Sequence, residues 1–310
     1  MASYLSAPHF HDEAAAFAFV ESRVWPNGPA CPRCGVMERI GKLEGKSTRH
    51  GVYKCYECRK PFTVRIGTIF EDSHVALHLW LQAIYLVAAS KKGISANQLH
   101  RVLGVTLKTA WFMGHRIREA MRDVSNGLLG DDGSSGIVEA DETYFGRVEG
   151  MGKGQGYAKK RKVFSLLERG GKVRSFHVPQ VTADTLGPIM GKHIAKRARV
   201  MTDTAGLYKK IKVRDSFRSH ETVNHFEGEY ARGDVTTNSV EGYFGILKRG
   251  IFGTYQHCGE NHFHRYLAEF DFRHNNRKSL GVNDAERAER LVKGIVGKRL
   301  LYQTTSGTEG

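Results

Sequence analysis

Four cysteines near the N-terminus constrain the fold of this chain more than any other feature. Cys31 and Cys34 form one C-x2-C knuckle, and Cys55 and Cys58 form a second, with twenty residues between the two. This spacing is typical of a four-cysteine zinc site, because a tetrahedral zinc ion can take two thiolates from each of two tight turns. A small, glycine-rich segment with few core residues also needs such a staple. The sequence therefore predicts a structural zinc ribbon.

The alternative interpretation is a redox pair, or a set of buried thiols without metal. A catalytic zinc is disfavoured, because four cysteine ligands leave no open position for water. The fifth cysteine, Cys258, stands apart from the knuckles in the sequence. We expect it to be an ordinary buried thiol.

The charge of the chain bears on its partners. The 310 residues include 47 Lys and Arg against 32 Asp and Glu, a net charge of +15. A surface this basic attracts phosphate backbones or anionic membranes. The longest apolar stretch, residues 77–89, is too short to span a bilayer, so nucleic acid is favoured and no membrane partner is expected. Acidic Asp12 and Glu13 stand where a signal peptide would be apolar, which predicts a cytoplasmic, nucleoid-associated protein.

Residues 71–125 have helical patterns. Residues 77–87 are too densely apolar for a one-sided surface helix and predict a core helix. Residues 95–103 and 106–121 predict two helices joined by a turn at Gly104, a rhythm that suits a DNA-binding helix-turn-helix. Lys108 and Thr109, at the start of the second helix, would then contact the bases. The alternative is a plain helical hairpin with a solvated basic face.

The remainder of the chain has strand patterns mixed with helical ones, which predicts an α/β fold. Strands are expected at residues 137–145, 162–167, 173–181, 199–202 and 222–226. Helices are expected at residues 182–195, 206–212, 237–249 and 262–275, the third of them capped by Thr237 or Asn238. The chain is thus predicted to contain an N-terminal helix and zinc ribbon (1–70), a helical DNA-binding segment (71–125), a linker (126–136), a catalytic domain (137–280) and a C-terminal helix and tail (281–310).

Three acidic residues occur in the chain order that phosphoryl transfer on DNA requires. Asp141 lies inside the first of these strands, Asp203 ends a later strand, and Glu241 lies near the start of a helix. Divalent ions activate the attacking oxygen and stabilise the leaving oxygen in such reactions, and Mg²⁺ prefers oxygen ligands. Each acid alone is a weak signal, but the ordered set is stronger. By alternation Glu139 shares a face with Asp141, whereas Glu142 points away and is expected at the surface.

These motifs together resemble the ISXO-like insertion-sequence transposases, a bacterial group related to the eukaryotic Merlin elements. The resemblance covers nearly the whole chain. It rests on the segments CPRCG at 31–35, YKCYEC at 53–58, VEADETY at 138–144, TD at 202–203, NSVE at 238–241, GTY at 253–255 and FDFRHN at 270–275. It implies a ribonuclease H-like mixed sheet with flanking helices, in which Asp141, Asp203 and Glu241 hold Mg²⁺ or Mn²⁺. It also implies that Lys248 contacts the transposon end.

A basic loop between the first two strands favours the same function. It contains Lys153, Lys159, Lys160 and Arg161, and its tip is rich in glycine. The tip lacks the Walker spacing of a nucleotide-binding loop. We expect the loop to clamp a DNA backbone, with a merely solvated loop as the alternative.

The sequence thus predicts a DDE transposase that works on double-stranded DNA as a homodimer or larger assembly. It would bind the terminal inverted repeats of an insertion sequence, mostly through phosphate contacts, and cleave the DNA at the element's end. The freed 3′-hydroxyl would then attack target DNA. The alternatives are a non-catalytic zinc-ribbon DNA-binding regulator and a structure-specific ribonuclease H-like nuclease.

Overall fold

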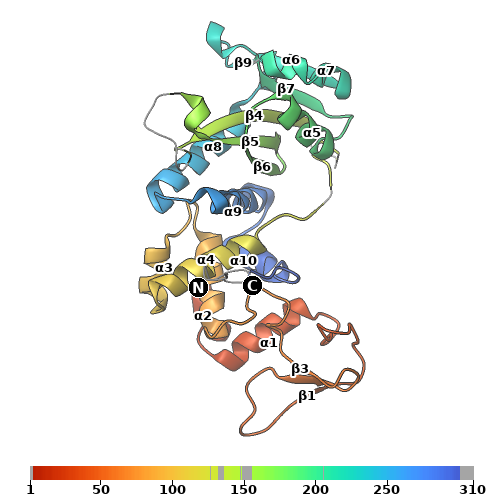
Figure 1. Cartoon of the computed structure of the whole chain (residues 1–310), viewed down its shortest axis with the longest axis vertical. Coiled ribbons are helices and arrows are strands. Elements are labelled where there is room, and N and C mark those ends of the chain that lie inside the picture. The colour runs from red at the N-terminus through yellow and green to blue at the C-terminus, as the bar shows by residue number, and fades with distance from the viewer. Residues whose placement is uncertain are drawn as a thin grey trace, which may run out of the picture. The chain divides into compact units, whose positions relative to one another are not determined.

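The chain folds into two compact units (Figure 1). The computed structural model describes residues 3–125, 127–131, 136–146, 148, 156–204 and 206–300. Met1–Ser90, Ile94–Met121 and Asn283–Gly310 make up the first unit, and Lys91–Gly93 and Arg122–Val282 make up the second. The expected parts 1–70, 71–125 and 281–310 therefore fall almost entirely within one unit.

The first unit begins with a helix and a small sheet. Helix α1 (Glu13–Val24) is capped by Asp12, whose carboxylate accepts a hydrogen bond from the Ala15 N–H. The antiparallel sheet that follows is ordered β1 (Ile40–Lys42), β2 (Tyr53–Cys55) and β3 (Pro61–Phe62). Its core consists of Phe62 and two of the cysteines, with Trp25 packed beside them. So few apolar side chains explain why this segment needs a metal staple.

Three helices follow, as predicted: α2 (Leu77–Ala89), α3 (Ala96–Leu103) and α4 (Leu107–Ala120). Helix α2 is the apolar core helix, with seven buried residues. No helix among the described residues is long and apolar enough to cross a membrane.

The turn between α3 and α4 has the chemistry of a helix-turn-helix. Ser95 caps α3, and Gly104 ends it in the left-handed conformation, with a φ of 65° that favours glycine. Thr106 then caps α4 by accepting a hydrogen bond from the Thr109 N–H. The structure therefore confirms two helices joined by a tight turn at Gly104, and their use as a DNA-binding helix-turn-helix stays a prediction.

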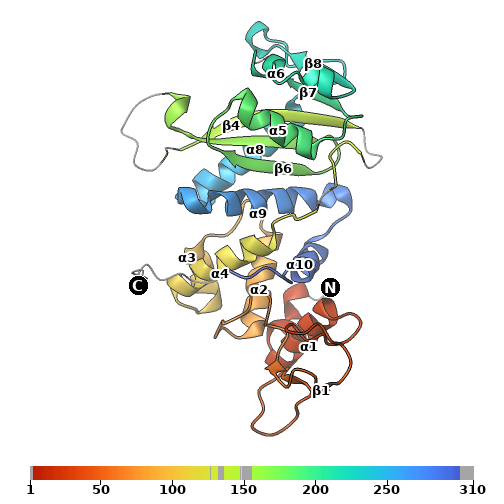
Figure 2. The ribbon, with the colours of Figure 1, turned by 45° about the vertical axis from the view of Figure 1, so that its right-hand side comes forward.

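Helix α10 (Asp284–Lys293) completes the first unit although it comes last in the chain. It packs on α1 and α2 (Figure 2). The Arg287 guanidinium donates to the Ala88 carbonyl at the end of α2 (3.1 Å), and the Lys298 ammonium donates to the Ala120 carbonyl at the end of α4 (2.8 Å). Cations at helix C-termini satisfy carbonyls that have no partner within the helix and interact favourably with the helix dipole. The C-terminal segment thus holds the ends of two helices.

A substitution at Leu291 tests whether α10 stabilises the first unit, because this side chain is fully buried. We expect Leu291→Ala to lower the free energy of unfolding of the first unit by about 2–5 kcal/mol. Hydrogen exchange should then quicken in α1 and α2 but not in the strands of the second unit. Val296→Ala, at a site that is 55% exposed, should change stability by no more than about 0.5 kcal/mol. Equal loss of protection in both units would contradict the assignment of α10.

A five-stranded mixed sheet forms the centre of the second unit, in the order β6-β5-β4-β7-β8. Strands β4, β5 and β6 are antiparallel neighbours, whereas β7 and β8 run parallel to β4. This arrangement confirms the predicted ribonuclease H-like α/β fold. The strand bounds are β4 (Ile137–Phe145), β5 (Arg161–Glu168), β6 (Val173–Val178), β7 (Arg199–Asp203) and β8 (Ser219–Val223).

Helices cover both faces of this sheet (Figure 1). Val138 and Ala140 of β4 point to one face, where they pack with α5, α6 and α7. Phe145 points to the other face, which is covered by α8 and α9. A short hairpin of β9 and β10 precedes α8. The bounds are α5 (Ala183–His193), α6 (Gly206–Lys210), α7 (Val213–Ser216), β9 (Ala231–Arg232), β10 (Val235–Thr236), α8 (Asn238–Gly250) and α9 (Phe263–Asn275).

The predicted strand at residues 222–226 was misplaced. The strand observed is Ser219–Val223, and His225–Glu227 form a 3-10 turn. The reason is the register with β7, which runs from the Arg199–Ser219 pair to the Asp203–Val223 pair. Strand β8 therefore ends where its partner strand ends.

Candidate metal centres and DNA-binding residues

The four cysteines predicted to bind zinc converge in the structure. The Sγ atoms of Cys31 and Cys58 are 3.7 Å apart, as are those of Cys34 and Cys55, and all four lie within 4.8 Å of one another. Zinc–sulfur bonds of about 2.3 Å in a tetrahedron separate the sulfurs by roughly 3.8 Å. The cysteine set therefore fits a zinc ion, which confirms the predicted structural site.

The backbone of the first knuckle favours the thiolate form of Cys31. Burial raises the pKa of this thiol, but hydrogen bonds from the Arg33 and Cys34 N–H groups and from neighbouring thiols lower it to about 7. Gly35 turns the knuckle back in the left-handed conformation, with a φ of 75°. Because the thiolate is the form that binds metal, this turn prepares the site for zinc.

Zinc removal should therefore unfold the ribbon and leave the second unit folded. We expect one zinc ion per wild-type chain by elemental analysis. Cys55→Ala should lose both the zinc and the hydrogen-exchange protection of the ribbon strands. Cys258, a buried thiol of the second unit, supplies the control. Cys258→Ala should keep one zinc ion per chain. A full equivalent of zinc in Cys55→Ala would refute the site.

Asp141 and Asp203 project from neighbouring strands toward the same face of the sheet. Strand β4 pairs in parallel with β7 at Glu139 and Met201, and each aspartate follows two residues later. Because side chains alternate along a strand, both aspartates lie on one face at the same level. Glu241 belongs to the first turn of α8, the helix that covers this face. The fold thus brings the elements bearing the three predicted acids together.

Burial and the negatively charged side chains that gather around Asp141 raise its pKa. Burial raises the pKa of Asp141 to about 8, and the negative charges of Glu142, Asp203 and Glu241 add to the effect. The Glu142 N–H opposes it by donating a 2.8 Å hydrogen bond to the Asp141 carboxylate. A divalent cation would relieve the repulsion among these oxygens, so the donor set suits an ion such as Mg²⁺.

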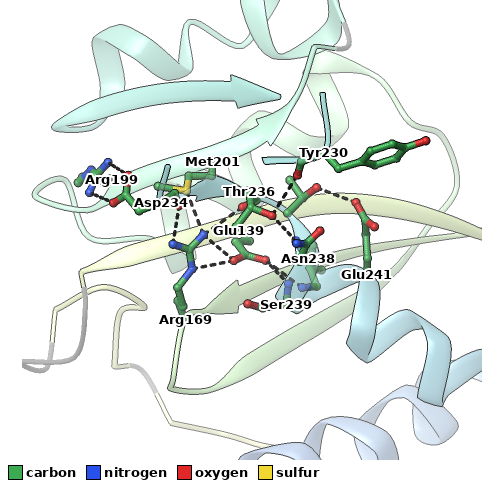
Figure 3. A network of polar contacts seen from close by, with 12 residues as sticks. Glu139, Arg169, Arg199, Met201, Tyr230, Asp234, Thr236, Asn238, Ser239 and Glu241 are labelled. Atoms are coloured by element: carbon green, nitrogen blue, oxygen red, sulfur yellow. Dashed lines mark hydrogen bonds and ion pairs between the residues drawn. The ribbon is translucent and has the colours of Figure 1, made fainter. Parts of the chain in front are cut away.

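Glu241 is engaged within its own helical turn. Its carboxylate, drawn in Figure 3, accepts a 2.7 Å hydrogen bond from the Thr237 hydroxyl. It also lies 3.5 Å from Nε2 of His225. Across the described ranges, the cysteines are the one group of three or more metal-ligating side chains whose atoms lie within 4.8 Å of one another.

Glu142 was predicted to lie at the surface, and this prediction was wrong. Its side chain does point away from Asp141, but α6 covers that face of the sheet. The Tyr208 hydroxyl donates a 2.5 Å hydrogen bond to the Glu142 carboxylate, and burial raises the pKa of both groups. Because helices cover both faces of this sheet, a side chain that points away from one buried face points into the other.

Glu139 has a role that sequence reasoning missed. It is fully buried, and its carboxylate accepts hydrogen bonds from the Ser239 and Val240 N–H groups at 2.9 and 3.0 Å (Figure 3). Helix α8 was expected to be capped by Thr237 or Asn238, but the Thr237 side chain makes no cap bond and turns to Glu241. The available signal was a carboxylate on the predicted buried strand that was not assigned to the metal site, because buried charges need partners.

The two residues of the first unit that are predicted to contact DNA bases differ in solvent exposure. Lys108 is exposed in the first turn of α4. Thr109 is half-buried, and its hydroxyl lies 2.8 Å from that of Thr106, which caps the same helix. Base contact by either residue stays a prediction.

The basic residues predicted in the second unit also differ. Lys160 and Lys248 are exposed and Lys159 is half-buried, while Lys153 lies outside the described residues. Arg161 donates to the Cys258 carbonyl, and its guanidinium lies 4.8 Å from the centre of the Phe263 ring. Arg161 therefore helps to hold the fold, and DNA binding by this set stays a prediction.

Two exposed tyrosines were not among the predicted site residues. Tyr157 packs on Tyr144 with ring centres 4.4 Å apart, and the Lys160 ammonium lies 5.2 Å from the Tyr157 ring. Tyr230 stacks on His225, the neighbour of Glu241, with ring centres 5.3 Å apart. Exposed aromatic rings near cations can stack on nucleobases.

Asp141→Asn should stabilise the metal-free protein at high pH. An unfolded aspartate has a pKa of about 3.9, so from there up to about pH 8 the folded chain keeps a proton that the unfolded chain has released. Raising the pH through this window lowers wild-type stability, whereas asparagine cannot ionise. By urea denaturation at pH 8 in chelator, the variant should exceed wild type by at least about 1.4 kcal/mol.

The same variant at pH 4 is the control, because this pH is at the lower edge of the window, where the ionisation of Asp141 contributes little and the two proteins should differ little. Added Mg²⁺ should favour wild type, since a ligand that binds the folded state stabilises it. A stability difference between Asp141→Asn and wild type that does not change with pH would contradict the raised pKa of the Asp141 carboxyl.

The chain matches two known domain families. Residues 134–275 match the ISXO2-like transposase domain, and residues 11–61 match the transposase zinc-ribbon domain. Together the two matches cover more than half of the chain. The chain therefore contains an ISXO2-like transposase domain preceded by a transposase zinc-ribbon domain.

A curated relative and a solved structure are also similar to this chain. An uncharacterized protein in transposable element ISH50 of Halobacterium salinarum is 27% identical over 271 residues, which are 80% of this chain and 86% of the relative. Among solved structures, the cryo-EM structure of the simian T-cell lymphotropic virus intasome with PP2A regulatory subunit B56 gamma contains a chain with 14% identity and a TM-score of 0.33. That match covers 70% of this chain and 76% of the other, and it is too remote to support an argument.

Proposed function

We propose that this protein is a DDE transposase that cuts and joins DNA with the help of divalent metal ions. The observation that carries the proposal is the side-by-side placement of Asp141 and Asp203 on parallel strands, beneath the helix that bears Glu241. The family match supports DNA transposition, and the acid cluster supports phosphoryl transfer.

Asp141, Asp203 and Glu241 would hold two Mg²⁺ or Mn²⁺ ions. When bound, such ions activate the attacking oxygen and stabilise the leaving oxygen of an in-line displacement. Glu241 would exchange its hydrogen bond from Thr237 for a place in this site, because its side chain is 40% exposed and reachable by solvent ions.

Basic residues would hold the DNA, in keeping with the net charge of +15. The ribbon and the helix-turn-helix-like pair would bind the terminal inverted repeats, mostly through phosphate contacts. Tyr157 and Tyr230 would stack on bases close to the cleaved bond. The remaining contacts are assigned to the residues predicted from the sequence: Lys108, Thr109, Lys153, Lys159, Lys160, Arg161 and Lys248.

Two transfers would then take place in one site. Water would first attack the phosphodiester at the element's end, and the freed 3′-hydroxyl would next attack target DNA. The attacking groups are water and then the DNA 3′-hydroxyl, so no tyrosine or serine nucleophile and no covalent bond between protein and DNA are needed. Because two element ends must meet, we expect a homodimer or larger assembly, acting at the nucleoid in the cytoplasm.

A cleavage assay on a labelled duplex with the flanking inverted repeat tests this function. Wild type should nick at the repeat boundary with Mg²⁺ and not with chelator. Asp203→Asn should reduce the rate on the order of 10²-fold or more, the scale typical of losing a preorganised electrostatic group. Asp184→Asn, an exposed acid in the first turn of α5, should cleave like wild type.

The rival functions give different results in the same assay. If wild type and Asp203→Asn bind the repeat equally and neither cuts with Mg²⁺ or Mn²⁺, the protein is a DNA-binding regulator. If cutting ignores the repeat and follows branched DNA instead, it is a structure-specific nuclease.

A further inference from the structure

We propose that the buried ion pair of Glu139 and Arg169 is the positioning element of the acid site. The pair fixes, relative to one another, the three segments that bear Asp141, Asp203 and Glu241. This inference rests on the proposed function, and it assigns a role to two residues that are not themselves metal ligands.

The Glu139 carboxylate uses both of its oxygens within the fold (Figure 3). One oxygen accepts from Nε of Arg169 at 2.9 Å and lies 2.8 Å from a second guanidinium nitrogen. The other accepts from the Ser239 and Val240 N–H groups. With three hydrogen bonds and the ion pair to Arg169 on a fully buried carboxylate, Glu139 is satisfied within the fold and is not available as a metal ligand.

Arg169 extends the contact to two further segments. Its guanidinium donates to the Asp234 and Thr236 carbonyls at 2.7 and 3.1 Å, on the hairpin that leads into α8. It also donates to the sulfur of Met201 on β7 at 3.2 Å. Figure 3 shows the guanidinium pointing toward all three of these groups and Glu139.

On each of the three segments, the pair contains or contacts a residue one or two positions from a proposed ligand. Glu139 precedes Asp141 by two residues on β4, and Met201 precedes Asp203 by two residues on β7. Ser239 and Val240 immediately precede Glu241 on α8. A shift of any one segment would therefore break a bond to the pair before it moved a ligand. Groups that orient ligands in this way tune metal affinity without touching the metal.

The negative charge of Glu139 matters as well as its shape. Helix N-termini carry partial positive charge and favour anions, and charge-assisted hydrogen bonds are stronger than neutral ones. Glutamine has nearly the same size as glutamate but replaces one acceptor oxygen with a donor. Glu139→Gln should therefore loosen the start of α8 while leaving the volume of the core unchanged.

The test compares Glu139→Gln with Glu269→Gln in the full chain. Glu269 is the matched control, because it is also a fully buried acid paired with an arginine, Arg273, but it lies on α9. We expect Glu139→Gln to speed hydrogen exchange at the Ser239 and Val240 amides at least tenfold. Its affinity for Mn²⁺, measured by electron paramagnetic resonance without DNA, should fall about 10–100-fold. Glu269→Gln should change neither quantity.

A double-mutant cycle separates positioning from general destabilisation. If Glu139 acts through Glu241, the Glu139→Gln/Glu241→Gln double variant should bind Mn²⁺ no more weakly than the single variant that has the lower Mn²⁺ affinity. Losses that multiply would overturn the inference. Arg169→Lys covers the case in which Glu139→Gln does not fold, because it keeps the charge but not the forked contacts; it too should weaken Mn²⁺ binding.

Failure of this inference differs from failure of the proposed function. If wild type binds Mn²⁺ at the acids and Glu139→Gln binds it equally well despite faster exchange in α8, the positioning role is refuted and the function stands. If wild type binds no Mn²⁺ at the acids and does not cleave, the proposed function is refuted together with the inference.

Discussion

Strand β4 is paired with β5 on one side and with β7 on the other, and helices cover both of its faces. A strand in this position cannot slip by one residue without turning its apolar side chains into the wrong core. Asp141 is therefore fixed on a rigid element, and the parallel pairing with β7 places Asp203 beside it. The fold maintains this placement although burial and neighbouring charge disfavour the ionised form of Asp141. Such locally unfavourable charge is typical of functional sites.

Two carboxylates on the same face of β4 thus have opposite roles. Glu139 receives two helix N–H groups and an arginine, which satisfy its charge. Asp141 receives one backbone N–H and is surrounded by other acids. The chemical difference between the two side chains is one methylene group, so their roles are set by their partners. One acid is satisfied by partners within the fold, and the other is the one that we propose as a metal ligand.

Features that depend on nearby residues could be predicted from the sequence, whereas features that depend on distant partners could not. The cysteine site and the helix-turn-helix-like pair depend on local spacing and capping, and the sheet depends on alternation, so each leaves a pattern in the chain. The cap of α8 comes from a strand 100 residues earlier, and Glu142 is buried by Tyr208, 66 residues later. Helix α10 joins the first unit from the far end of the chain. Short-range patterns contain no trace of such distant partners.

The metal chemistry of the second unit can be observed directly. A crystal structure of the chain with Mn²⁺, read by anomalous scattering, should show peaks between Asp141 and Asp203, with the Glu241 carboxylate moved from Thr237 toward the metal. The cysteine site provides an internal reference through the zinc signal. Ordered zinc with no manganese at the three acids, or manganese bound at other residues, would contradict the catalytic assignment.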